Sequence, residues 1–457
     1  MEANFHHALK IREDLCEGCS HCMNVCPTEA LRVKNGKAVL FADKCVDCGK
    51  CFRECPSSAI IIDHDDFSHI FEYNYRVALI PAVFSAQFPE EISQRQILSV
   101  LLEIGFTHVY EVENGAEVLS EAIQKYADEH KDIRPIISSF CPAIVRLIQV
   151  KFPALTDNIM LLKPPLDIAA NFIKKEMISK GIPENEIGIF YVTPCAAKIA
   201  AIKEPVGETS SPITGAINMD FLFNKVYHQV ARKSNQSCAV PVLSELSEKA
   251  RKWSLTNGEA QHIKGRCLAI DEIHNVIEFL EKIENDEITD IDFLELRACD
   301  ESCAGGVLVH GNRFLTVERL KNNTFNHSNT DINNHHPDAF RPIIEEKEFL
   351  MENIGINSVN PRSIMILDED MAEAMRKMDK VNQVIKILPM IDCSLCGAPT
   401  CQSFAHDIVM GEGELKECVF IQRTMEQNGE LTSEESNKIL RNIWGFEKTN
   451  KYRKIKS

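Results

Sequence analysis

The spacing of the cysteines is the feature of this sequence that most directly implies chemistry. Two runs share the pattern C-x2-C-x2-C-x3-C followed by proline: Cys16, Cys19, Cys22 and Cys26, then Cys45, Cys48, Cys51 and Cys55. A [4Fe–4S] cube needs four convergent thiolates, and three cysteines two residues apart can wrap a loop around three irons. Paired structural zinc sites also use C-x2-C, but two complete runs that each end in Cys-Pro favour iron–sulfur clusters.

The two runs resemble bacterial two-cluster ferredoxins, in which the fourth cysteine of each run ligates the other cluster. The resemblance therefore implies two crossed ligand sets: Cys16, Cys19, Cys22 and Cys55 in one, and Cys45, Cys48, Cys51 and Cys26 in the other. The small residues between them, such as Gly18 and Gly49, should let backbone amides approach the cluster sulfurs. We expect an α+β ferredoxin domain over residues 1–68.

Length and charge narrow the class of protein further. The chain has 457 residues, enough for two to four domains, and its formal net charge is −17, which argues against nucleic acid as the main partner. No segment approaches the roughly 18 continuous apolar residues of a membrane span, and the first residues lack an apolar signal core. We expect a cytoplasmic protein with no membrane span in a reducing, anaerobic environment.

From about residue 75 the sequence alternates between strand-like and helix-like segments. We expect strands at 77–83, 107–112, 135–138, 187–192 and 291–296, and helices at 91–104, 115–129 and 165–179. This alternation predicts βα units and a mostly parallel sheet, which usually carries its chemistry at the carboxyl ends of the strands. We expect this α/β domain to span residues 75–365.

Four further cysteines follow strand-like runs of the α/β domain. Cys141 follows the strand at 135–138, Cys195 follows 187–192, and Cys299 and Cys303 follow 291–296. A single cysteine at a strand end is often a small buried hydrophobic residue. Four of them at three strand–loop junctions are a candidate ligand set for one more cluster.

These motifs resemble the catalytic domain of [FeFe]-hydrogenases, whose sequences read Thr-Ser-Cys-Cys-Pro, then Met-Pro-Cys-x2-Lys-x2-Glu, then Glu-x-Met-Ala-Cys-x2-Gly-Cys with a glycine run. The corresponding segments here read SSFCP, TPCAAKIAA and ELRACDESCAGG. The resemblance covers roughly residues 1–320 and implies a two-lobed fold with mostly parallel sheets. It also implies that the four cysteines hold a [4Fe–4S] cube, that Cys303 bridges to a diiron unit with CO, cyanide and a dithiolate, and that Lys198 contacts a cyanide.

Several positions depart from the family pattern. The family cysteine that hands protons to the active site is Phe140 here, and a phenyl ring cannot carry a proton. The family glutamate after the lysine is Ala201, and the two methionines that pack on the diiron unit are Thr193 and Arg297. We therefore expect cube ligation to be kept and fast hydrogen turnover to be lost. A divergent, sensory branch of the family differs at these same positions.

A third cysteine pattern lies near the C-terminal end. It reads C-x2-C-G-x3-C-x16-C and consists of Cys393, Cys396, Cys401 and Cys418. It resembles the small [4Fe–4S] domain found beside corrinoid-protein and membrane ferredoxin-oxidoreductase subunits, whereas a zinc ribbon would have a second C-x2-C pair. We expect a helix at 369–387, a helical cluster domain at 385–425 that serves as a second electron port or docking surface, and a tail at 426–457.

The remaining candidates carry less chemistry. Cys238 and Cys267 belong to no ligand set, and we interpret both as structural. The Asn- and His-rich segment 320–338 is more typical of a solvated loop than of a metal site formed by His327, His335 and His336. The sequence contains no phosphate-binding Gly-Lys loop and no convincing dinucleotide fingerprint, so we expect neither NAD nor flavin.

Three hypotheses follow from these residues. An [FeFe]-hydrogenase-like oxidoreductase would pass electrons through ferredoxin-type clusters to a buried hydrogenase-type cluster, and Lys198 favours it. A sensor would hold the same cofactor and turn over slowly, which Phe140 and Ala201 favour. A relay would hold [4Fe–4S] clusters and no diiron unit, which Thr193 and Arg297 favour.

Arg297 distinguishes the hypotheses most sharply, because its guanidinium could bind an anionic ligand, block the diiron unit or point away into an ion pair. Enzymatic activity depends on the diiron unit. The expected partners are a ferredoxin or a signalling protein, together with hydrogenase maturation proteins if the diiron unit is present.

Overall fold

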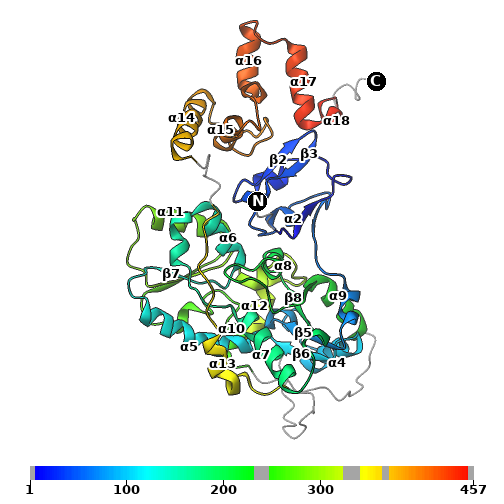
Figure 1. Cartoon of the computed structure of the whole chain (residues 1–457). Coiled ribbons are helices and arrows are strands. Elements are labelled where there is room, and N and C mark those ends of the chain that lie inside the picture. The colour runs from blue at the N-terminus through cyan, green and yellow to red at the C-terminus, as the bar shows by residue number, and fades with distance from the viewer. Residues whose placement is uncertain (1–5, 231–245, 323–339, 363–369, 451–457) are drawn as a thin grey trace. The chain divides into compact units, whose positions relative to one another are not determined.

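The chain forms two compact units, which we describe separately (Figure 1). Unit 1 combines residues 1–62 with 362–457, and unit 2 consists of residues 63–361. The computed structural model describes residues 6–230, 246–322, 340–362 and 370–450. Unit 1 therefore contains residues 1–62 of the predicted ferredoxin domain, 1–68, together with the predicted C-terminal cluster domain.

Unit 2 contains two parallel sheets. The four-stranded sheet has the order β6-β5-β8-β9, with β5 at Tyr75–Ile80, β6 at His108–Glu111, β8 at Ile187–Thr193 and β9 at Gly215–Asn218. The three-stranded sheet has the order β10-β11-β7, with β7 at Ile136–Ile137, β10 at Cys267–Ile270 and β11 at Phe293–Leu296. The predicted α/β core with mostly parallel sheets is confirmed.

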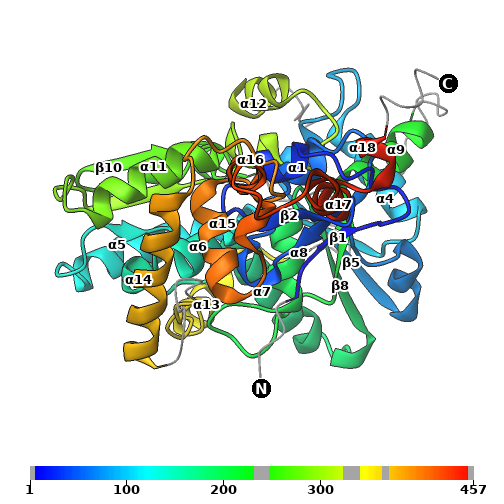
Figure 2. The same cartoon turned by 90° about the horizontal axis from the view of Figure 1, so that it is seen from above.

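The strands of unit 2 are apolar because helices cover the sheets. All seven residues of β8 are buried, which is typical of a central parallel strand, and Figure 2 shows β8 beside β5. The helices predicted at 91–104, 115–129 and 165–179 correspond to α4, α5 and α7, at Gln94–Glu103, Asn114–Glu129 and Pro165–Ser179. Two short helices that the sequence analysis did not predict begin directly after candidate ligands: α6 at Pro142–Lys151 and α8 at Ala196–Lys203.

Unit 2 contains six further α-helices among its described residues. They are α3 at Ala82–Ser85, α9 at Met219–Val230, α10 at Glu248–Lys252, α11 at Ile273–Glu284, α12 at Arg313–Asn322 and α13 at Lys347–Glu352. Cys267 lies in β10 and is half-buried, and its thiol lies 3.5 Å from the carbonyl oxygen of Ile263. The positions of Cys238, His327, His335 and His336 lie outside the described residues, as does most of the segment 320–338.

The N-terminal part of unit 1 is an internally duplicated α+β structure. Its two antiparallel ribbons pair β1 (Leu9–Ile11) with β4 (Ile60–Ile62), and β2 (Leu31–Lys34) with β3 (Lys37–Leu40). Each cysteine run contains one short helix, α1 at His21–Asn24 and α2 at Lys50–Arg53. The two halves thus repeat the same order of cluster loop, short helix and strand.

The C-terminal part of unit 1 is helical. It contains α14 at Met371–Ile387, α15 at Cys401–Met410, α16 at Val419–Gln427, α17 at Ser433–Trp444 and α18 at Phe446–Thr449. The predicted helix at 369–387 corresponds to α14, and the predicted tail contains α17 and α18. Among the described residues, no helix combines the length and the apolar character that crossing a membrane requires.

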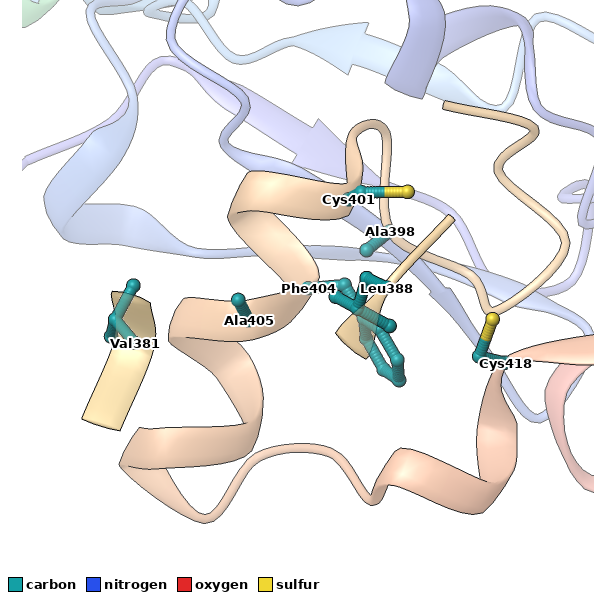
Figure 3. Packing of buried hydrophobic residues seen from close by; sticks show 7 residues of the cluster. All are labelled: Val381, Leu388, Ala398, Cys401, Phe404, Ala405 and Cys418. Carbon is teal, nitrogen blue, oxygen red and sulfur yellow. The ribbon is translucent and has the colours of Figure 1, made fainter. Parts of the chain in front are cut away.

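A small hydrophobic core holds the C-terminal helices together. Leu388 and Phe404 lie at its centre, Val381 of α14 lies at one side, and the sulfurs of Cys401 and Cys418 lie at the other (Figure 3). Two candidate ligands are therefore themselves part of this core. A cluster bound there would be covered by apolar side chains on one side.

The packing of α5 against α7 leads to the first prediction. A Cβ atom added at Gly115 would lie 2.2 Å from the carbonyl oxygen of Pro165, a backbone atom that cannot rotate away. Gly115→Ala should therefore lower the free energy of unfolding of unit 2 by about 1–2 kcal/mol, despite its better helix propensity. Gly355→Ala is the control, because a Cβ atom there meets no other atom within 4 Å. Calorimetry should show a lower melting temperature for the first variant alone; equal temperatures would refute the packing argument.

Candidate metal centres

The structure brings the N-terminal cysteines together in two crossed groups. The pKa of the Cys22 thiol rises to about 12, first because of burial and then because three thiols lie near it: Cys19, Cys16 and Cys55. In the second group, burial and the nearby Cys26 thiol raise the pKa of Cys48 to about 12. Cys26 has the same effect on Cys45 and Cys51. Each fourth cysteine therefore lies with the other run, as the predicted ligand sets require.

Backbone amides approach the sulfurs of these groups. The amides of Gly18 and Ala38 point at Cys16 Sγ, at 3.4 and 3.3 Å. The Ala30 amide lies 3.2 Å from Cys26 Sγ, and the equivalent Ala59 amide lies 3.2 Å from Cys55 Sγ. N–H donors of this kind stabilise negative charge on sulfur, so both loops fit ligands of an anionic cluster.

A third group of cysteines lies where the two sheets of unit 2 meet. Cys141 follows β7 and caps the N-terminus of α6, whereas Cys195 follows β8 of the other sheet and caps α8. The pKa of Cys195 rises to about 12 overall. Burial is the main cause, Lys198 opposes the rise, and the nearby thiols of Cys303 and Cys141 add to it. Cys299 lies four residues before Cys303, in the turn that follows β11.

Lys198 lies within this group at the wall of a largely apolar pocket with a cavity volume of about 100 Å³. Its Nζ atom is 3.8 Å from Cys303 Sγ and 3.2 Å from the hydroxyl oxygen of Tyr191. Burial opposes its charge, but the neighbouring groups of Cys303, Tyr191 and Cys195 raise the pKa of Lys198 overall. The lysine is therefore a buried cation directed at the sulfur that the family resemblance makes the bridge.

Phe140 separates two cations at the pocket. Its ring centroid is 4.8 Å from Lys198 Nζ and 3.9 Å from the guanidinium carbon of Arg297. Such cation–π contacts hold the ring in place. The side chain that stands where the family carries a thiol therefore has no atom able to accept or release a proton.

Arg297 forms an ion pair and stays close to the cysteines. Its Nη2 atom is 3.1 Å from Glu259 and its Nε atom is 3.4 Å from Glu295. The buried guanidinium also lies near Cys303 and Cys141, which contribute to its raised pKa after burial and the two carboxylates. Its Nη1 atom has no hydrogen-bond partner among the described residues. A buried, partly unsatisfied cation beside thiols fits an anionic group in this site.

Two carboxylic acids in the pocket wall were not identified in the sequence analysis. Glu113 follows β6 and accepts a hydrogen bond from the Ala82 amide at 2.8 Å, and burial raises its pKa to about 7. Asp167 lies in the first turn of α7, and burial together with nearby Glu208 raises its pKa to about 7. The position of Glu113 at a strand's carboxyl end is the one signal that could have indicated it.

The C-terminal cysteines form a fourth group. Cys393, Cys396, Cys401 and Cys418 all line one small cavity. Burial and the other three thiols raise the pKa of Cys396 to about 12, although the Ala398 amide opposes this. The carboxylate of Asp392 accepts a hydrogen bond from the Cys401 amide at 2.6 Å and so fixes the start of α15.

Four groups of converging, largely buried thiols define an iron–sulfur protein with several centres, because such thiols become thiolates by binding metal. Three family models match the chain: the 4Fe-4S dicluster domain over residues 8–56, the iron only hydrogenase large subunit, C-terminal domain, over 75–219, and a putative Fe-S cluster over 388–420. Residues 75–219 are thus similar to the hydrogenase large subunit, and residues 8–56 are similar to a ferredoxin-type dicluster domain. No curated protein matches it.

Solved [FeFe]-hydrogenase structures resemble the chain weakly. A HydA(deltaEFG) structure, described as revealing stepwise H-cluster assembly, is 14% identical with a TM-score of 0.45. Apo HydA1 from Chlamydomonas reinhardtii in a cysteine-to-histidine variant is 13% identical with a TM-score of 0.46. Each match covers 63% of this chain and 94% of the other.

The buried carboxyl of Asp167 predicts a pH dependence. Its pKa of about 7 in the folded chain exceeds the ordinary value of 3.8, so between these values the folded chain holds a proton that the unfolded chain releases. The free energy of unfolding should therefore fall as pH rises from about 4 to 7, by up to about 1.4 kcal/mol per pH unit. Asp167→Asn should weaken this fall in urea unfolding at pH 5 and 7. The exposed Asp157→Asn should not, and identical slopes in all proteins would contradict the assignment.

Proposed function

We propose that this protein passes electrons through ferredoxin-type clusters to a buried hydrogenase-type cluster and carries out slow or sensory hydrogen chemistry there. Its family matches support an iron–sulfur, oxidoreductase-like function. The observation that carries the finer proposal is the pocket beside Cys303, with Lys198 directed at that sulfur. The pocket lies directly beside this sulfur, and its buried cation suits an anionic cofactor.

Within this proposal Cys141, Cys195, Cys299 and Cys303 hold a cube, and Cys303 also bridges to a diiron unit. When bound, that unit would supply the chemistry that interconverts hydrogen with protons and electrons. The ammonium group of Lys198 holds an anionic ligand by a charge-assisted hydrogen bond. Arg297 is a second buried cation near Cys303 and Cys141. Its Nη2 atom pairs with Glu259, its Nε atom lies 3.4 Å from Glu295, and neither Nε nor Nη1 has a hydrogen-bond partner among the described residues.

The proton side of the pocket explains why we propose slow turnover. Phe140 and Ala201 line the pocket at the two positions where the family carries proton-transfer groups, and neither can exchange a proton. The carboxyls of Glu113 and Asp167 hold protons near neutral pH in another part of the pocket wall. A protein with this arrangement would bind hydrogen but convert it slowly, and slow turnover suits a sensor.

The N-terminal pair of clusters connects this site to a redox partner. We propose a ferredoxin or a signalling protein as that partner, and hydrogenase maturation proteins as the source of the diiron unit. In this proposal residues 1–68 form the ferredoxin domain, residues 75–365 form the hydrogenase-like domain, and residues 385–425 form the small cluster domain.

A relay that holds only [4Fe–4S] clusters is the second candidate. Thr193 favours it, because its hydroxyl donates to the Cys195 carbonyl at 2.9 Å and so turns toward the backbone. It does not offer the apolar packing that the family methionine gives the diiron unit. Electron transfer would then end at the middle cube.

An infrared spectrum separates the two candidates. Protein matured anaerobically with the hydrogenase assembly machinery should show bands of metal-bound CO and cyanide, in a region where proteins do not absorb. Cys303→Ser is the control and should lose the bands while keeping the iron of the other three centres. A spectrum without bands, from protein that still binds about sixteen irons, would reject the diiron unit in favour of the relay.

A substitution at Phe140 tests the proton gap. Phe140→Cys should raise hydrogen turnover by about 100-fold or more, because a positioned acid–base group commonly contributes that much. Phe140→Leu is the matched control: it also removes the ring but adds no proton carrier. Turnover would be measured by hydrogen evolution with a reduced one-electron donor. Equal rates in the two variants, in protein that shows the infrared bands, would refute this explanation.

A further inference from the structure

The two parts of unit 1 are joined by a buried ion pair. Arg32 of β2 donates from Nε and Nη2 to the two carboxylate oxygens of Asp407 on α15, at 2.5 and 3.0 Å. Its Nη1 atom donates to the carbonyl oxygens of Glu29 and Leu31, at 2.7 and 3.0 Å. Arg32 is 1% exposed. A bidentate pair with further bonds fixes the relative position of the two parts, because removing one partner leaves a buried charge.

The loops that carry the candidate ligands touch across this junction. Ser394, which directly follows Cys393, donates from its hydroxyl to the side-chain oxygen of Asn24 at 3.4 Å. Asn24 lies in α1, two residues from both Cys22 and Cys26. These two cysteines belong to different N-terminal groups. A path from Cys393 to either N-terminal group therefore runs through Ser394, crosses the hydrogen bond to Asn24, and continues along two residues of chain to Cys22 or to Cys26.

A second contact runs parallel to the first. Thr400, which precedes Cys401, donates from its hydroxyl to Glu29 at 3.2 Å. The Val33 amide donates to the carbonyl oxygen of Gly397 at 2.9 Å. A Cβ atom on Gly397 would lie 2.3 Å from the Val33 carbonyl oxygen, so only glycine permits this approach. The cluster loop is thus paired directly with the backbone of β2.

The last helices of the chain hold both kinds of cluster loop at once. The indole Nε1 atom of Trp444, at the end of α17, donates to the carbonyl oxygen of Leu395 at 2.8 Å. Lys448 of α18 donates to the carbonyl oxygen of Gly18 at 2.5 Å. Leu395 lies between two C-terminal cysteines, and Gly18 lies between two N-terminal ones. The end of α17 and the following α18 therefore fix the spacing between the C-terminal cysteine loop and the first N-terminal cysteine loop.

We propose that the C-terminal cluster is the third member of one electron path with the two N-terminal clusters. The step is a one-electron exchange, in which one cluster is oxidised as its neighbour is reduced, and it moves no proton and breaks no bond. The inference rests on the iron–sulfur part of the proposed function and does not require the diiron unit.

The C-terminal cluster is the outer end of this path. Cys393 is exposed, and the side chains that precede it, Met390 and Ile391, are 52% and 56% exposed. The cysteines of the N-terminal groups are buried or half-buried. An external one-electron carrier can therefore approach the C-terminal cluster more closely than the others within unit 1.

Electron paramagnetic resonance of the fully reduced full-length protein tests the proposal, because reduced clusters that lie close together split each other's signals. Asp407→Lys places a cation against buried Arg32 and should separate the two parts while leaving every cysteine in place. Glu412→Lys is the matched control, because Glu412 pairs with Lys34 at 2.8 Å on the surface. Cys396→Ser removes the C-terminal cluster and gives the spectrum of the remaining centres.

The wild-type and Glu412→Lys spectra should contain a splitting that the Cys396→Ser spectrum lacks. Asp407→Lys should keep all its iron and lose that splitting. A wild-type spectrum equal to the Cys396→Ser spectrum plus one isolated signal would overturn the proposal. If Asp407→Lys loses iron, the difference between the wild-type and Cys396→Ser spectra alone decides whether the C-terminal cluster couples to the N-terminal clusters. A protein without CO or cyanide bands would sink the hydrogen proposal and leave this result unchanged.

Discussion

The burial of negatively charged sulfur is the physical constraint on which this architecture depends. A thiolate cluster in an apolar interior is stable when donors or cations surround it. The two units meet this requirement differently. In unit 1 the donors are mainly backbone amides, such as those of Gly18 and Ala30 at Cys16 and Cys26. In unit 2 the middle group has the side chain of Lys198 nearby, and Arg297 is itself held by carboxylates. Backbone amides therefore approach the thiols of unit 1, whereas buried side-chain cations lie beside the thiols of unit 2.

In unit 2 the candidate cysteine ligands and the positions where the family carries proton-transfer groups are different residues. The ligands sit where strands end and helices begin, so the backbone fixes them. The residues that distinguish this chain from the family pattern lie beside them: Phe140 and Ala201 line the pocket, and Thr193 ends β8. Substitutions at these positions would therefore leave the four cysteines in place.

Local patterns predicted the parts of the structure that local physics decides. Buried β8 and amphipathic α7 matched their predicted limits closely, because apolar periodicity and flanking prolines mark them. The cysteine spacing predicted ligand sets, and these sets remain predictions. The pairing of Arg32 with Asp407 could not be predicted, since the two residues are 375 positions apart and neither belongs to a motif. The same holds for Arg297, whose alternatives only the three-dimensional position of its partners could separate.

The meeting of the two chain ends in unit 1 has a consequence for biogenesis. A ribosome releases the ferredoxin-type segment hundreds of residues before α15, so Arg32 waits for its partner while unit 2 folds. A fragment that ends before residue 362 would lack Asp407 and Gly397 and so expose the Arg32 guanidinium and the Val33 amide, which makes such a fragment a poor stand-in for the native ferredoxin part.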